Sequence, residues 1–174
     1  MKSRKIYVFF SVLACGAKVA GSAEGKSNTP ILHTLEIRSG KLRAEIGLAG
    51  EAALQLLETE ECQRVFSDFK DPQGHTLREN LDALNLTAAA YLHTLLFSDG
   101  GKYAKRCEDP GLVAVTKRGS QVILICPAQF EKVVLESRRY AGAVIIHEAL
   151  HTLGLSENPP SPLEITQKVL GRCR

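Results

Sequence analysis

Hydrophobic residues through much of the chain recur at intervals of three and four, which is the spacing of one face of an α-helix. Where this spacing holds, we expect helices over residues 51–57, 60–69, 77–84, 86–97 and 127–139. Thr76 with Glu79 three positions later matches a capping box, which predicts where the third of these helices begins. Between the helices, the residues Asp-Pro-Gln-Gly at 71–74 predict a turn.

Two other segments are typical of β-strands, because they are rich in β-branched residues. Residues 112–116 and 121–125 flank the sequence Lys-Arg-Gly-Ser at 117–120, and together they predict an antiparallel hairpin. A short strand is also expected at residues 35–37. The expected fold class is therefore α+β, a helix-rich, zincin-like single domain with one small antiparallel hairpin.

The segment 141–154 is apolar on nearly every side, which predicts a buried helix. His147, Glu148 and His151 interrupt it. An unsatisfied buried polar group costs roughly 2 kcal/mol or more, so these side chains need partners. Two histidines four residues apart lie on one helical face and can bind the same metal ion, while Glu148 can reach a water bound to that ion. This is the His-Glu-x-x-His pattern of metallopeptidases.

The sequence continues to Gly154 and Glu157, and it then resembles the extended metzincin motif of the zincin metallopeptidases. The resemblance covers residues 147–157. It implies a third ligand at Glu157, a position that is usually His but is a carboxylate in snapalysin-like proteases. The only methionine is Met1, so the chain departs from metzincins in lacking a Met-turn. Glu164 is the rival third ligand, although its position three residues after Ser161 also suits a helix cap.

The resemblance implies one Zn²⁺ ion, a polypeptide substrate, and hydrolysis by a metal-activated water with Glu148 as general base. Candidates for stabilising the oxyanion are Tyr103, Tyr140 and Arg172. By analogy with zincins, the strand at 121–125 is expected to lie along the cleft and pair with substrate. The alternative function is a non-catalytic exported module that keeps a zincin fold as a scaffold.

The beginning of the chain has the three parts of a secretory signal. Basic residues within positions 2–5 precede an apolar run at 6–17 and small residues that end at Ala23. That run is too short to span a bilayer. Cleavage after Ala23 would remove a signal peptide of residues 1–23. Alternatively, residues 12–15 resemble a bacterial lipobox, which would end the signal at residue 14 and attach lipid to Cys15.

Either route exports the protein to a periplasmic, cell-envelope or extracellular location. A polar leader follows to about residue 30, so the catalytic domain is expected at residues 31–174. Loss of residues 1–23 leaves 18 basic against 19 acidic residues and changes the formal charge from +3 to −1. The basicity therefore belongs to the signal, and we expect no nucleic-acid partner. We expect a monomer.

Four cysteines remain after Cys15, and an oxidising compartment would allow three pairings among them. We favour Cys107 with Cys126, which lie before and at the end of the predicted hairpin, and Cys62 with Cys173. His93 lies among hydrophobic residues, so we interpret it as a packing residue and not as a metal ligand.

Overall fold

The computed structural model describes residues 32–35, 37–103 and 105–174, and the expected signal, the Cys15 lipidation site and the leader lie outside these residues. The described elements are, in chain order, β1 (His33–Leu35), α1 (Gly40–Leu56), α2 (Glu60–Gln63), α3 (Val65–Asp68), α4 (Leu77–Ala83), α5 (Ala88–Leu92), β2 (Leu96–Asp99), α6 (Gly100–Tyr103), the 3-10 helix η1 (Lys105–Glu108), β3 (Ala114–Thr116), β4 (Val122–Ile125), α7 (Pro127–Glu136), α8 (Arg138–Thr152) and α9 (Pro162–Arg172). The fold class is α+β, as predicted. No helix in the described part of the chain has the length and apolar character needed to cross a membrane.

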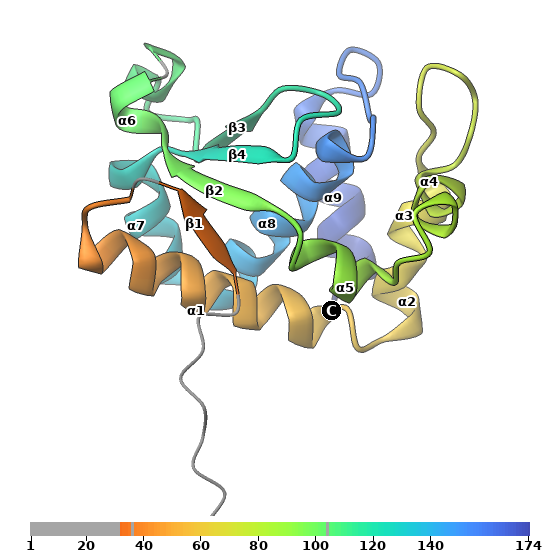
Figure 1. The fold of residues 1–174 in the computed structure, drawn as a ribbon, viewed down its shortest axis with the longest axis horizontal. Helices are drawn as coiled ribbons and strands as arrows, with labels where there is room; N and C mark the ends of the chain where they lie inside the picture. Colours follow the sequence, from red (N-terminus) through yellow and green to blue (C-terminus); the bar gives the residue numbers. More distant parts are fainter. Residues whose placement is uncertain (1–31, 36, 104) are drawn as a thin grey trace, which may run out of the picture.

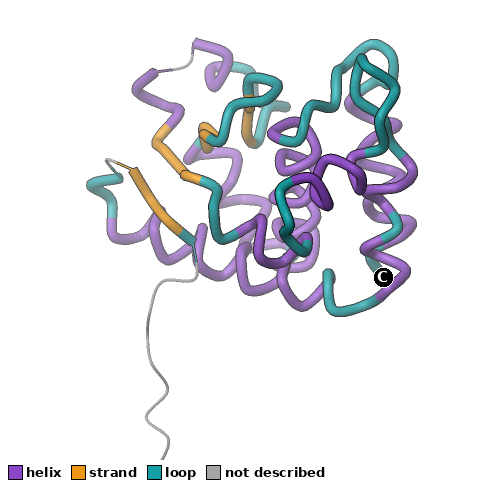
Figure 2. Tube along the Cα trace, turned by 45° about the vertical axis from the view of Figure 1, so that its right-hand side comes forward, coloured by secondary structure: helices purple, strands orange, loops and turns teal. Residues whose placement is uncertain are grey.

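The strands form a four-stranded sheet in the order β1-β2-β4-β3 (Figure 1). β1, β2 and β4 are parallel, and β3 pairs antiparallel with β4 at one edge. Phe97 of β2 and Ile123 and Ile125 of β4 are fully buried. Figure 2 shows how small this sheet is beside the helices.

Helix α8 is the central helix of the domain and packs against α1, α7, α9 and β3. Its contact with α1 requires a residue without a side chain, because a Cβ atom on Gly142 would lie 2.7 Å from the backbone nitrogen of Ala53. On α1, the hydrophobic positions that face the core are Leu42, Ile46, Ala49, Ala53 and Leu56. This close packing places α8 in the interior, so the prediction of a buried helix is confirmed.

Several predicted elements are confirmed, although some of their boundaries differ from those expected. The hairpin forms from β3 and β4, the turn at 71–74 is present, and Thr76 and Glu79 form the expected capping box. The first strand lies at His33–Leu35, two residues before the expected position. The helix expected at 51–57 is the last part of α1, which begins at Gly40 behind the N-cap Ser39.

The helix expected over residues 86–97 is wrong beyond Leu92. The segment forms the short α5 and then the buried strand β2, which lies between β1 and β4. A strand buried on both faces reads as a continuous apolar run, so its spacing can also fit a helix. β2 ends at Asp99, and Gly100 begins α6. The helix expected at 127–139 ends at Glu136, because Ser137 has extended backbone and caps α8.

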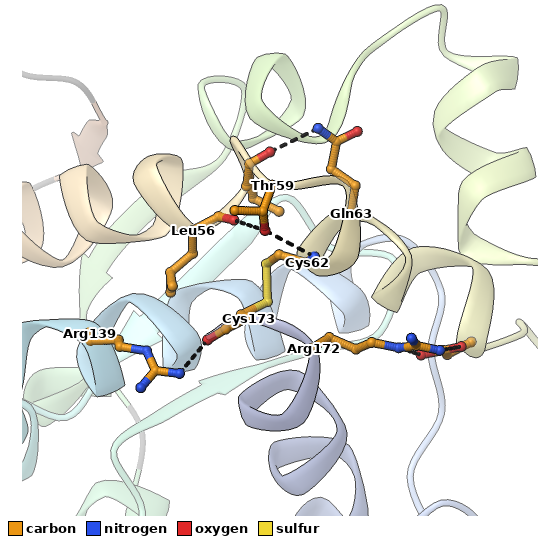
Figure 3. Close-up of a disulfide and its surroundings, with 9 residues drawn as sticks. Leu56, Thr59, Cys62, Gln63, Arg139, Arg172 and Cys173 are labelled. Atoms are coloured by element: carbon orange, nitrogen blue, oxygen red, sulfur yellow. Dashed lines mark hydrogen bonds and ion pairs between the residues drawn. A yellow bond between two sulfur atoms is a disulfide. The ribbon is translucent and has the colours of Figure 1, made fainter.

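Both favoured disulfides are confirmed. Cys62–Cys173 joins α2 to the residue that follows α9, and Figure 3 shows Arg139 of α8 donating a hydrogen bond to the Cys173 carbonyl at 2.8 Å. Cys107–Cys126 joins η1 to the end of β4. The two bridges span 111 and 19 residues of sequence. Each therefore links segments that lie on different elements of the domain.

Candidate metal centre

Helix α8 carries His147 and His151 into the interior one turn apart. Its N-cap is Ser137, whose hydroxyl accepts a hydrogen bond from the Tyr140 backbone N–H. His147, Glu148 and His151 are 9%, 6% and 5% exposed. The Nε2 atoms of the two histidines face each other at 3.1 Å. The four-residue spacing thus brings both rings to one point, as the sequence predicts.

The outer nitrogen of each ring has a hydrogen-bond partner that fixes its protonation. Nδ1 of His151 lies 3.0 Å from the Leu155 carbonyl, which can only accept, so this nitrogen carries the proton. Nδ1 of His147 lies 3.0 Å from the Thr166 hydroxyl of α9, which donates its own proton to the Pro162 carbonyl at 2.9 Å. The Thr166 oxygen therefore accepts from His147. In the neutral rings, both Nε2 atoms are left with unprotonated lone pairs.

Glu157 adds a third acceptor to this point. Its Oε1 atom lies 3.3 Å from Nε2 of His151, and His147, His151 and Glu157 form a group that could hold a metal ion. Two ligands at about 2.0 to 2.1 Å from a tetrahedral ion lie about 3.3 Å apart. The two separations that involve His151, 3.1 and 3.3 Å, fit this value, and all three donor atoms lie within 4.8 Å of one another. Three lone-pair donors that face one another repel, and a shared cation removes the repulsion.

The backbone after α8 turns so that Glu157 can approach the histidines. Gly154 has φ of 115°, a conformation that residues with side chains rarely adopt. Asn80 of α4 donates a hydrogen bond to the Leu153 carbonyl at 2.9 Å, where the helix ends. The helix stop and the third donor thus depend on a glycine, as predicted, and on a contact from α4 that the sequence does not indicate.

Glu148 lies beside the three donors and faces β3. Its Oε2 atom and the Thr116 hydroxyl of β3 are both buried and have no hydrogen-bond partner among the described residues. Burial raises the pKa of Glu148, while the nearby Thr116 hydroxyl and His151 act in the opposite direction. A buried carboxyl oxygen with an unused hydrogen-bonding position can accept a proton from a group in the cleft.

Burial lowers the pKa of His147 to about 4, and the charge of His151 acts in the same direction. The ring is therefore neutral near pH 7. A neutral imidazole is the form that binds metals, so the protein environment keeps this donor ready for a cation.

The site opens into a cleft of about 420 Å³. One wall, here called the metal side, consists of α8, the loop at residues 153–161 and α9. The other wall, here called the strand side, consists of η1, residues 111–116 and the turn at 117–120. His147, Glu148, His151 and Glu157 all line the cleft. A molecule in the cleft can therefore contact the donors and the carboxyl group together.

Some residues predicted for the site lie elsewhere. Glu164 forms the capping box of α9 with Ser161 and is not in the metal-donor group. Arg172 is paired with Asp68 and Glu61, away from the cleft lining, so its expected oxyanion role is wrong. Its distance from His147 follows from its place at the far end of α9.

Tyr140 does line the cleft, while the Tyr103 side chain lies outside the described atoms. His93 is exposed as the C-cap of α5, so its packing role is wrong. The strand expected to pair with substrate, residues 121–125, is β4, and both of its edges already pair with β2 and β3. The strand that lines the cleft is instead β3.

We compared the chain with protein-family models, curated proteins and solved structures, and none of them matches.

Proposed function

We propose that this chain is an exported zinc metallopeptidase that hydrolyses peptide bonds in the cleft between α8 and β3. The proposal rests on one observation: three potential metal-donor atoms converge beside a buried carboxyl group in an open cleft. Two histidines and one carboxylate form a ligand set that suits catalytic zinc. His147, His151 and Glu157 would hold the ion, which when bound supplies a Lewis acid and makes water more acidic.

Glu148 would move the protons of the reaction. Its unpartnered Oε2 atom accepts a proton from a water in the cleft as the water oxygen attacks the carbonyl carbon of the peptide. The same carboxyl then gives this proton to the leaving amine nitrogen when the C–N bond breaks. Burial favours the protonated form of Glu148, which suits the second step. Thr116 faces this carboxyl and would help to orient it.

The edge strand β3 would position the substrate. No other strand in residues 32–35, 37–103 and 105–174 pairs with its outer edge. An extended peptide can add to such an edge through main-chain hydrogen bonds. This arrangement would bring a peptide bond alongside Glu148, since Thr116 of β3 is the residue that faces it.

Export is supported by the two disulfides, because disulfides persist mainly in oxidising compartments. The signal-like residues 1–23, or the lipobox-like residues 12–15, would direct this export.

The decisive experiment compares the unmodified protein with Glu148→Gln in zinc content and in casein hydrolysis. We expect about one zinc per chain in both, and at least a 100-fold loss of hydrolysis in the variant, because general acid–base catalysis contributes about 10² to 10⁴. The matched control is Glu164→Gln, which changes an exposed capping carboxylate of α9 and should keep both properties. Absence of hydrolysis in the unmodified protein would favour the non-catalytic module, and absence of zinc would exclude the zinc peptidase.

A further inference from the structure

The cleft contains two arginines that none of the steps above uses. Arg106 and Arg118 both line it from the strand side, and both are exposed. Neither makes an ion pair with a carboxylate among the described residues. By contrast, Arg172 at the far end of α9 is paired with two acidic residues. Neither positive charge in the cleft is therefore neutralised by a direct ion pair among the described residues.

Arg106 is held at the cleft by covalent and hydrogen bonds to its neighbours. It precedes Cys107, which is bonded to Cys126 at the end of β4. Gln129 of α7 donates hydrogen bonds to the backbone carbonyls of Cys107 and Asp109 at 3.3 and 3.2 Å. Arg106 and Glu148 line the same cleft. The guanidinium thus lies on the wall opposite the proposed reaction centre.

Arg118 is held from the other end of β3. The next residue, Gly119, donates its backbone N–H to the carbonyl of His151 at 3.0 Å. The Arg118 guanidinium donates a hydrogen bond to the Ser156 hydroxyl, next to Glu157. This contact orients the side chain but leaves its charge unneutralised. One arginine therefore precedes β3 in the chain, the other follows it, and both face the same cleft.

We propose that the cleft selects acidic peptides, with Arg106 and Arg118 binding carboxylate side chains of a substrate that lies along β3. This inference rests on the proposed function, and it names the substrate class of that site. Guanidinium groups bind carboxylates through paired hydrogen bonds, which gives them geometric as well as electrostatic selectivity. Within residues 32–35, 37–103 and 105–174, the carboxylates that line the cleft are Glu148 and Glu157. A divalent cation would balance these two charges, so the arginines would leave a net positive cleft.

The length of the strand side sets the scale of the substrate. The cleft is lined from Gly111 to Thr116, and the strand within this lining, Ala114–Thr116, spans about 10 Å of extended chain. A peptide that pairs with β3 and extends beyond both of its ends would therefore approach both arginines. Because each arginine lies beyond a different end of β3, acidic residues on both sides of the cleaved bond should contribute.

The test uses fluorogenic peptides that are identical except for Glu, Gln or Lys on either side of the central residues. For the mature chain, we expect kcat/KM to be highest for the Glu peptides and lowest for the Lys peptides. Arg106→Gln and Arg118→Gln should each reduce the preference for Glu over Gln about three- to tenfold, and high salt should weaken it. Arg→Lys at either position should keep part of the preference, since it keeps the charge.

Matched controls lie beside each arginine. Lys105 is in η1 and Lys117 is in the same turn as Arg118, but neither lines the cleft. Lys105→Gln and Lys117→Gln change the net charge of the protein by the same amount as the arginine variants. They should leave the preference unchanged, so a general charge effect can be separated from a local one.

A binding measurement separates this inference from the proposed function. Fluorescence anisotropy of labelled Glu, Gln and Lys peptides is measured with zinc-loaded Glu148→Gln, with and without the arginine substitutions. Preferential binding of the Glu peptide that depends on both arginines supports the inference even if the unmodified protein hydrolyses nothing. Equal hydrolysis or equal binding of all three peptides overturns it, and hydrolysis without preference leaves the proposed function standing.

Discussion

The two sides of the cleft are each held by a disulfide, but the two bridges have different surroundings. On the metal side, Cys62 and Cys173 are fully buried, and the bridge anchors the end of α9. On the strand side, Cys107 is partly exposed, and its bridge fixes a 3-10 turn at the cleft. The first bridge fixes the position of α9, the helix that carries Thr166, which contacts His147. The second fixes η1, the segment that carries Arg106.

This difference indicates that the metal-donor group and the proposed substrate contacts are anchored to the rest of the domain by different bridges. Helix α9 also binds α2 and α3 through Arg172, whose guanidinium donates to Asp68 at 2.7 and 2.9 Å. η1 has no comparable ion-pair network among the described residues, and its support comes from Gln129 and the disulfide. Variants on one side should therefore affect metal binding and stability, while variants on the other should affect the choice of substrate.

The largest effect is expected from removing the buried bridge. Replacing Cys62 and Cys173 together by Ala should lower the free energy of unfolding by about 5 kcal/mol, because the bridge closes a loop of about 110 residues. Urea unfolding of the zinc-free protein measures this change. Zinc affinity should fall as well, since the end of α9 is released. The comparison would be contradicted if this variant lost less free energy of unfolding than a variant without the Cys107–Cys126 bridge.

Removing the strand-side bridge should cost less stability. Replacing Cys107 and Cys126 by Ser is expected to lower the unfolding free energy by about 3 kcal/mol, because the closed loop is much shorter. Zinc stoichiometry should be unchanged when the protein is folded, while the preference for acidic peptides should decrease. Loss of zinc from the folded variant would show that the two sides are not independent.

Acid should destabilise the metal side of the zinc-free protein. The folded pKa of His147 is about 4, below its ordinary value of 6.5, so the unfolded chain binds the proton first as the pH falls. The contribution of His147 to the free energy of unfolding is fully present above pH 6.5. As the pH falls from 6.5 to 4, the free energy of unfolding should decrease by up to about 3 kcal/mol. The measurement is urea unfolding in the Glu148→Gln background, because the raised pKa of Glu148 acts in the opposite direction.

Two further variants locate this pH dependence. His147→Leu in the same background should flatten the profile between pH 6.5 and 4. Arg106→Gln, on the strand side, should leave it unchanged. An unaltered slope in the His147 variant would assign the dependence to another group.

The smallest effect is expected from Thr166. Thr166→Val removes the acceptor of the His147 Nδ1 proton but keeps the shape of the side chain. Partners of this kind contribute about 10- to 100-fold to metal affinity. Competition with a zinc-binding dye measures the loss, and Thr166→Ser should restore the affinity. Equal affinities for all three proteins would mean that α9 supports the fold without orienting the ligand.

The sequence was informative where a function depends on local spacing. His147, His151, Gly154 and Glu157 lie within one helix and its following turn, so their separation along the chain determines their arrangement in space. Both favoured cysteine pairs are also confirmed as disulfides. The capping role of Glu164 could be predicted because Ser161 is only three residues away.

Contacts between distant segments were not predictable in the same way. Thr166 lies on a helix whose start reads as an ordinary capping box, and nothing in its neighbours indicates His147, 19 residues earlier. Thr116 reads as one more β-branched strand residue. Arg118 falls in a polar turn, which is where solvated charges are common. Strand β2 was missed because its apolar residues also fit a helical period.

The bond between the Gly119 N–H and the His151 carbonyl ties the hairpin to the helix that bears the histidines. If a peptide docks against β3, this backbone bond would fix the distance between the docking strand and the histidines of α8. The number of substrate residues between the part that pairs with β3 and the cleaved peptide bond would then be set by the protein. Peptides of different lengths would all be cleaved at the same distance from the paired residues.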